Sequence, residues 1–256
     1  MKTFAIATAV LLMAGSLSAS EGRPDIDELV RHLDQLYRSE DSYSEMTMEI
    51  TTPNWSRTLT MKAWSRGTEN TFIRILSPAR EAGMATLRIG DQMWNYLPNT
   101  SSTVRVPPSM MSGSWMGSDI TNNDIVREIT YEEDYEYSYL PDSAAPEGSG
   151  DDVLYVELVP KRSTAVVWSS IVCAVRAEDL IPLWEKYYDS DGDLIRTIGF
   201  SGVEEMGGRT IPTLMEVVPA DEEGNRTTIE WTYAEFDQGV DEEIFTLRNL
   251  QRGDTD

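Results

Sequence analysis

A two-residue alternation of apolar and polar side chains recurs along most of the chain and strongly constrains its fold. Leu154, Val156 and Leu158 form one such run, and Pro182–Tyr188 and Leu194–Phe200 flank a polar turn. A period of two places alternate side chains on one face of a strand, and turns rich in Gly, Asp, Asn and Pro separate the runs. The pattern predicts about ten antiparallel strands, as in an all-β sheet or barrel.

Two segments break the alternation and predict helices. In Arg23–Glu40, apolar residues recur at spacings of three and four, and Pro24-Asp25 is typical of a helix start. A shorter helix is expected within Ser118–Val126. The chain shows no internal repeat and no linker-like boundary, so we expect residues 21–256 to form a single domain.

The amino terminus has the features of a cleaved secretory signal. Lys2 supplies a positive charge, Phe4–Ala14 is an unbroken run of apolar or small residues, and Ser18–Ser20 offers the small residues that a signal peptidase needs. The apolar run is too short to span a bilayer, which takes about 20 residues. We therefore expect residues 1–20 to be removed, leaving an exported, soluble protein without a transmembrane segment.

Charge and rare residues argue against several classes of function. Lys and Arg number 21 against 44 Asp and Glu, a formal net charge of −23, which repels nucleic acid and disfavours adhesion to anionic lipid headgroups. The chain has one His, His32, and one Cys, Cys173. A His/Cys zinc cluster cannot form, and a catalytic triad or Cys–His pair would have to use these residues. We expect no metal, no cofactor and no enzyme activity.

One acidic run suggests a metal site. Asp189–Asp193 reads Asp-Ser-Asp-Gly-Asp, but an EF-hand loop starting at Asp189 needs Gly at its sixth position and Glu at its twelfth, where this chain has Leu194 and Phe200. The Asp-Gly pair instead predicts a hairpin turn. Other acidic clusters, such as Glu222-Glu223, lie in turns or polar segments and are interpreted as solvated surface rather than a hydrolase site.

Several uncommon sequence segments follow one another in a fixed order. Ser112–Asp124 reads Ser-Gly-Ser-Trp-Met-Gly-Ser-Asp-Ile-Thr-Asn-Asn-Asp. The others are Trp94–Pro98, then Pro182–Asp189 followed by Gly192 and Arg196-Thr197, and Gly207–Thr213. Together they resemble segments of a bacterial family of outer-membrane lipoprotein-sorting proteins that is similar to LolA and LolB. The resemblance covers roughly residues 40–250, and Ile120 stands where the family often has Phe.

The resemblance implies a fold and a function. The implied fold is mainly β (α+β): a strongly curved antiparallel sheet, an unclosed barrel, wrapped over an N-terminal helix and a short central helix. The implied function is a periplasmic carrier that binds acyl chains of lipoproteins or lipids for transfer toward the outer membrane. Members of the family resemble partners of RND-type inner-membrane exporters. The alternative is therefore an accessory or lipid-sensing subunit of such an exporter that ferries nothing.

Alternation and composition supply candidate binding residues for such a carrier. The chain has 12 Met and 7 Trp; composition alone favours a core role for them, although Met also suits surfaces that adapt to variable apolar ligands. The expected cavity residues are Leu59, Met61, Ile73, Ile75, Leu87, Ile89, Trp94 and Tyr96. The expected gate loop carries Met110, Met111, Trp115 and Met116, with Asp119 and Asp124 as helix-start residues that fix it. A one-residue register error would invert any of these strands.

Overall fold

The computed structural model describes residues 23–126, 130–141, 152–162, 164 and 166–252. The predicted signal peptide, residues 1–20, lies outside the described residues. The described residues form thirteen strands, more than the ten or so that the alternation predicted. They are β1 (Asp41–Thr51), β2 (Ser56–Arg66), β3 (Asn70–Ser77), β4 (Ala85–Ile89), β5 (Gln92–Leu97), β6 (Ser102–Arg105), β7 (Tyr135–Tyr139), β8 (Val153–Pro160), β9 (Ser170–Arg176), β10 (Pro182–Tyr188), β11 (Leu194–Met206), β12 (Arg209–Pro219) and β13 (Arg226–Phe236).

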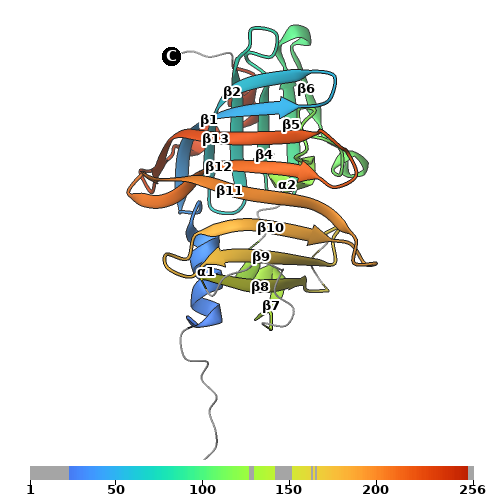
Figure 1. Ribbon diagram of the computed structural model, residues 1–256. Helices are drawn as coiled ribbons and strands as arrows, with labels where there is room; N and C mark the ends of the chain where they lie inside the picture. Colours follow the sequence, from blue (N-terminus) through green and yellow to red (C-terminus); the bar gives the residue numbers. More distant parts are fainter. Residues whose placement is uncertain (1–22, 127–129, 142–151, 163, 165, 253–256) are drawn as a thin grey trace, which may run out of the picture.

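All these strands belong to one antiparallel sheet that does not close. The strand order is β6-β5-β4-β3-β2-β1-β13-β12-β11-β10-β9-β8-β7, so β6 and β7 are its two edges. The sheet twists and curves strongly between these edges (Figure 1). The expected fold class, a mainly β protein with a curved and unclosed antiparallel sheet, is therefore confirmed.

The register explains which side chains face the inside of the curve. Met48 of β1 stands opposite Leu59 of β2 and Ile229 of β13, so three apolar side chains form a row across the sheet. All three are at least nine-tenths buried in the main core cluster. We call the face that carries this cluster the inner face and the opposite one the outer face.

The N-terminal helix α1 (Ile26–Gln35) packs against the main cluster and is shorter than the predicted Arg23–Glu40. Asp25 caps it, because its Oδ1 accepts hydrogen bonds from the backbone N–H groups of Asp27 and Glu28. Its buried face is Leu29, Val30 and Leu33. The other helical segments are η1 (Pro98–Thr100), η2 (Pro108–Met110), α2 (Asn122–Val126), α3 (Tyr131–Asp134), η4 (Glu242–Ile244) and α4 (Leu247–Leu250).

A second, smaller core lies on the outer face of β3, β4 and β5. Phe72 belongs to it while the next residue of β3, Ile73, belongs to the main cluster, because successive side chains of a strand point to opposite faces. The C-terminal segment covers this outer core with Phe245 and Leu250. The outer face of these strands is therefore apolar too, which two-residue alternation alone cannot distinguish from the inner face.

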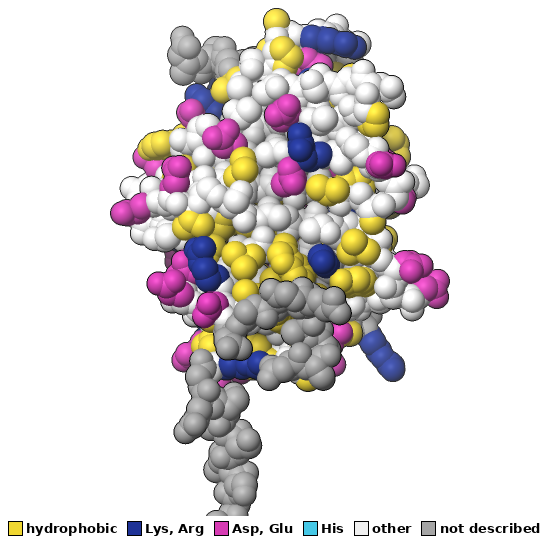
Figure 2. Space-filling view, in the orientation of Figure 1, with side chains coloured by type: hydrophobic (Ala, Val, Ile, Leu, Met, Phe, Trp, Pro, Cys, Tyr) yellow, Lys and Arg dark blue, Asp and Glu magenta, His cyan; other side chains and the backbone are white. Residues whose placement is uncertain are grey.

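Turns and surface follow the sequence closely. Asp189–Asp193 is a turn between β10 and β11, in which Asp189 Oδ1 accepts the backbone N–H groups of Asp191 and Asp193. Acidic side chains are spread over the face in Figure 2, and apolar ones gather in its lower half. Within the described ranges, none of the helices has the length and apolar character of a membrane span.

Candidate functional site

A cavity of about 430 Å³ lies between the inner face of the sheet, the end of α1 and the segment that contains α2 and α3. This volume is within the range of about 300–1,000 Å³ that is usual for small-molecule sites. Its apolar lining comes from Leu33, Leu36, Tyr37, Met46, Met48, Met61, Ile73, Trp115, Ile120, Ile125, Tyr131, Trp168, Ile171, Pro182, Tyr187, Ile198, Phe200, Met215, Val217, Ile229 and Trp231. Its polar lining comes from Arg38, Asp124, Glu185 and Arg196.

The eight expected cavity residues divide into two groups of four. Met61 and Ile73 line the cavity, and Leu59 and Ile75 are buried in the same inner cluster. The other four lie away from it: Leu87, Trp94 and Tyr96 on the outer core, and Ile89 at 40% exposure.

The assignment for β4 and β5 is thus corrected by one residue of register. Met93 of β5 faces the main cluster while its neighbour Trp94 faces the outer core. The sequence signal for this arrangement was the apolar pattern of the tail around Phe245 and Leu250, which needs a partner surface.

The expected gate loop presents one of its four apolar residues to the cavity. Trp115 lines it at 2% exposure, whereas Met110 is 60% exposed. Met111 and Met116 are partly buried against the main cluster. The loop is also densely hydrogen-bonded: the Asn122 side-chain amide donates to the backbone carbonyls of Met110 and Gly113, both at 3.0 Å.

The two aspartates at this loop have different roles. Asp119 ties the loop to β13, because its N–H donates to Thr227 Oγ1 at 2.9 Å and the Thr227 hydroxyl donates back to Asp119 Oδ2 at 2.6 Å. Asp124 forms a reciprocal capping pair with Thr121 at the start of α2: its Oδ2 accepts the Thr121 N–H, and its own N–H donates to Thr121 Oγ1.

Asp124 also forms an ion pair at the cavity wall that sequence reasoning missed. Arg196 of β11 donates to both carboxylate oxygens of Asp124, at 2.8 and 2.9 Å. Burial alone would raise the pKa of Asp124, but the hydrogen bonds and charge of Arg196 outweigh it and hold that pKa below its usual value. The guanidinium also lies over the rings of Tyr187, at 4.4 Å, and Trp168, at 5.2 Å.

A second polar group in the wall is the buried carboxyl of Glu185. It accepts the hydroxyl of Tyr131 at 2.5 Å and that of Tyr187 at 2.7 Å. Burial raises the pKa of Glu185, and the two tyrosine donors only partly offset that effect. The only cysteine, Cys173, is buried beside it, with Sγ 3.9 Å from Glu185 Oε1.

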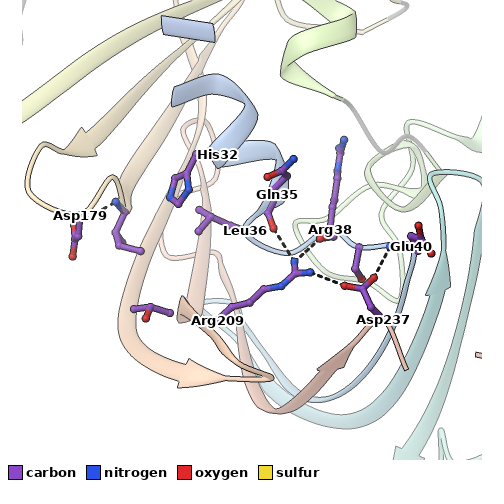
Figure 3. A pocket seen from close by; sticks show the side chains of 11 residues that line it. His32, Gln35, Leu36, Arg38, Glu40, Asp179, Arg209 and Asp237 are labelled. Carbon is purple, nitrogen blue, oxygen red and sulfur yellow. Dashed lines mark hydrogen bonds and ion pairs between the residues drawn. The ribbon is translucent and has the colours of Figure 1, made fainter. Parts of the chain in front are cut away.

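A larger and more open hollow, of about 1060 Å³, adjoins the end of α1 (Figure 3). Leu36 and Arg38 line both this hollow and the cavity. Arg209 reaches across it to the backbone carbonyl of Gln35 at 2.9 Å and to Asp237 Oδ2 at 3.2 Å (Figure 3). The lone His32 lines this polar hollow rather than the cavity.

An amphiphilic arrangement results from these two neighbouring spaces. The cavity is mostly apolar, and the hollow beside it offers charged and polar groups from α1, β12 and the loop after β13. Such a pair of spaces suits a molecule with an apolar chain and a polar end.

Comparison with solved structures defines the class of this fold. The chain resembles a DUF1329 family protein from Desulfovibrio piger at 29% identity, with 88% of this chain and 97% of that one covered and a TM-score of 0.77. It resembles a LolA superfamily protein from Nitrosomonas europaea at 22% identity, with 87% and 97% covered and a TM-score of 0.70. A putative outer membrane lipoprotein-sorting protein domain from Vibrio parahaemolyticus matches at 22% identity, with 88% and 98% covered and a TM-score of 0.73.

The chain therefore has a LolA-like fold, as the sequence segments indicated. None of the curated proteins matches it. Residues 67–252 match the model of a family described as "uncharacterized protein", and the chain belongs to that family.

Proposed function

We propose that this protein is an exported carrier that binds the acyl chains of lipoproteins or lipids in the cavity and carries them through the periplasm toward the outer membrane. The observation that carries the proposal is the largely apolar cavity between the curved sheet and the helical segments. Acyl chains released into water expose apolar area that costs about 25 cal/mol per Å², and such a space removes that area from water.

The neighbouring polar hollow supports the same proposal. The carbonyl end of a bound acyl chain would lie within the cavity, and a larger headgroup would extend past Leu36 and Arg38, where the two spaces adjoin. The hollow would then hold the headgroup or the start of a lipoprotein's peptide, which stays hydrated.

The first experiment is to purify the protein from the periplasm without detergent and to record native and then denaturing mass spectra. A co-purifying phospholipid or acylated peptide is expected. A protein that is reproducibly empty and takes up no fluorescent fatty acyl ester would contradict carriage and favour an accessory role beside an exporter.

A matched pair of variants tests whether the cavity is the binding site. Met61→Asp places a charge in the apolar lining, so uptake of the fluorescent acyl ester should fall at least about tenfold, since an unpaired buried charge is costly. Ile89→Asp makes the same chemical change at an exposed strand position and should bind like the wild type. Equal uptake by the two folded variants would exclude this cavity as the site.

A further inference from the structure

Two arginines line the cavity of this strongly acidic protein, and each already faces a carboxylate. Arg196 holds Asp124 through two hydrogen bonds, and their side chains are only 12% and 18% exposed. Arg38 lies 3.7 Å from Asp34, whose side chain is 8% exposed. Each cationic charge in the lining therefore has a counter-charge from the protein itself.

Glu185, the remaining carboxyl in the lining, offers no free group to a charged ligand. Both oxygens of Glu185 accept tyrosine hydroxyls, from Tyr131 and Tyr187. Burial raises the pKa of Glu185 and so favours its uncharged form. An ionised ligand head in this space would bring an uncompensated charge into a buried site, which is strongly unfavourable.

An uncharged carbonyl would meet a different situation beside Arg196. A guanidinium carries five N–H donors, of which the pair with Asp124 uses two. Arg196 Nε has no hydrogen-bond partner among the described residues, but almost none of its surface is exposed to a ligand. An uncharged carbonyl can still lie beside the pair, because it brings no net charge and leaves the charges of Asp124 and Arg196 balanced.

We propose that the Asp124–Arg196 pair makes the cavity selective for acyl chains that end in an uncharged ester or amide, and against chains that end in an ionised carboxylate. Asp124 acts in this as a specificity-determining residue, because it cancels the charge that would otherwise attract an anion. This inference rests on the proposed carrier function and specifies its ligand class.

The test compares ligands with the same chain and different heads. Monopalmitoylglycerol, palmitamide and palmitate each compete with a bound fluorescent acyl ester at mildly alkaline pH. The wild type should bind the two uncharged ligands at least about tenfold more tightly than palmitate, a difference of about 1.4 kcal/mol. Palmitamide has nearly the same shape as palmitate but no charge. Comparing these two ligands therefore tests the effect of charge on the wild-type protein alone.

Asp124→Asn then leaves Arg196 without its counter-charge. Palmitate affinity should rise about tenfold, while monopalmitoylglycerol affinity should change less than about twofold. Asp91→Asn is the control, because it makes the same charge change in the exposed turn between β4 and β5 and does not line the cavity. The control should keep the wild-type ratio.

The outcomes separate this inference from the carrier function. Binding of none of the ligands would overturn both. Equal wild-type affinity for palmitamide and palmitate would overturn the selectivity and leave carriage standing. An unchanged ligand ratio in folded Asp124→Asn would also overturn the role of the pair.

Discussion

Trp115 illustrates how one buried side chain can fix a loop that carries many small residues. Its indole Nε1 donates to Thr86 Oγ1 at 3.1 Å, and the Thr86 hydroxyl donates to Asn95 Oδ1 at 2.8 Å. The contact joins the loop before α2 to strands β4 and β5 on the inner face. A polar chain of this kind stabilises only while each buried partner stays paired.

Trp115→Phe should therefore lower the free energy of unfolding by about 1–3 kcal/mol, because Thr86 loses its buried donor and the smaller ring leaves space. Trp55→Phe is the matched control: Trp55 is 47% exposed and should change stability by less than about 0.5 kcal/mol. Urea unfolding of both variants measures the difference. Equal losses would show that the indole N–H contributes nothing.

The raised pKa of Glu185 predicts that stability depends on pH. Its folded-state pKa is raised above the ordinary value of 4.5, so the folded state binds more protons than the unfolded one as pH rises through that window, and stability falls. Glu185→Gln cannot ionise. The unfolding free energy of the variant minus that of the wild type should therefore grow as the pH rises above the ordinary glutamate pKa of 4.5. A pH-independent difference would contradict a raised pKa in the folded protein.

At the scale of elements, the C-terminal segment gives the sheet a second apolar contact. Leu250 of α4 is fully buried and packs with Phe72 and Leu87 on the outer face. Arg74 anchors the same helix, since its guanidinium donates to the backbone carbonyl of Asn249 at 2.9 Å. The C-terminal segment and the cavity lie on opposite faces of the sheet. A substitution in this segment should therefore change stability without changing ligand affinity.

Leu250→Ala should cost about 2–5 kcal/mol of stability, as deletion of a fully buried leucine does, while the folded variant keeps its affinity for a fluorescent acyl ester. Leu247→Ala in the same helix should cost little, because Leu247 is 44% exposed. Thermal unfolding and ligand titration are measured on both. A loss of affinity in folded Leu250→Ala would mean that the outer core and the cavity are coupled.

The same elements show what sequence can predict here. Alternation predicted the strands because a strand with one buried face has apolar residues at every second position. Apolar residues at spacings of three and four predicted α1 in the same way. It could not orient β4 and β5, where both faces are buried: Thr86 and Met93 face inward while Leu87 and Trp94 face outward.

The sequence also could not predict which polar side chains pair in the lining of the cavity. Arg196 and Asp124 are 72 residues apart, and only the tertiary fold brings β11 and α2 together. Tyr131 and Glu185 are 54 residues apart and meet in the same way. Such pairs leave no local pattern, whereas the distinctive Ser112–Asp124 segment did mark a part of the wall.

At the scale of the whole molecule, the excess negative charge is not found in the lining of the cavity. The protein carries a formal net charge of −23, and acidic side chains are scattered over the face shown in Figure 2. Inside, each arginine of the cavity lining is matched by a carboxylate. The outer charge therefore governs approach to other surfaces, while the interior governs which ligand is held.

This separation predicts how salt affects delivery to membranes. Transfer of a bound fluorescent acyl ester to vesicles of phosphatidylcholine should depend little on salt, because those vesicles carry no net charge. Adding phosphatidylglycerol should slow transfer at low salt, since the acidic protein is repelled over a screening length of about 30 Å at 0.01 M. Raising the salt to about 0.15 M shortens that length to about 8 Å and should restore most of the rate. Stopped-flow fluorescence measures each rate. Faster transfer to the anionic vesicles at low salt would show instead that a local basic surface, and not the net charge, directs the encounter.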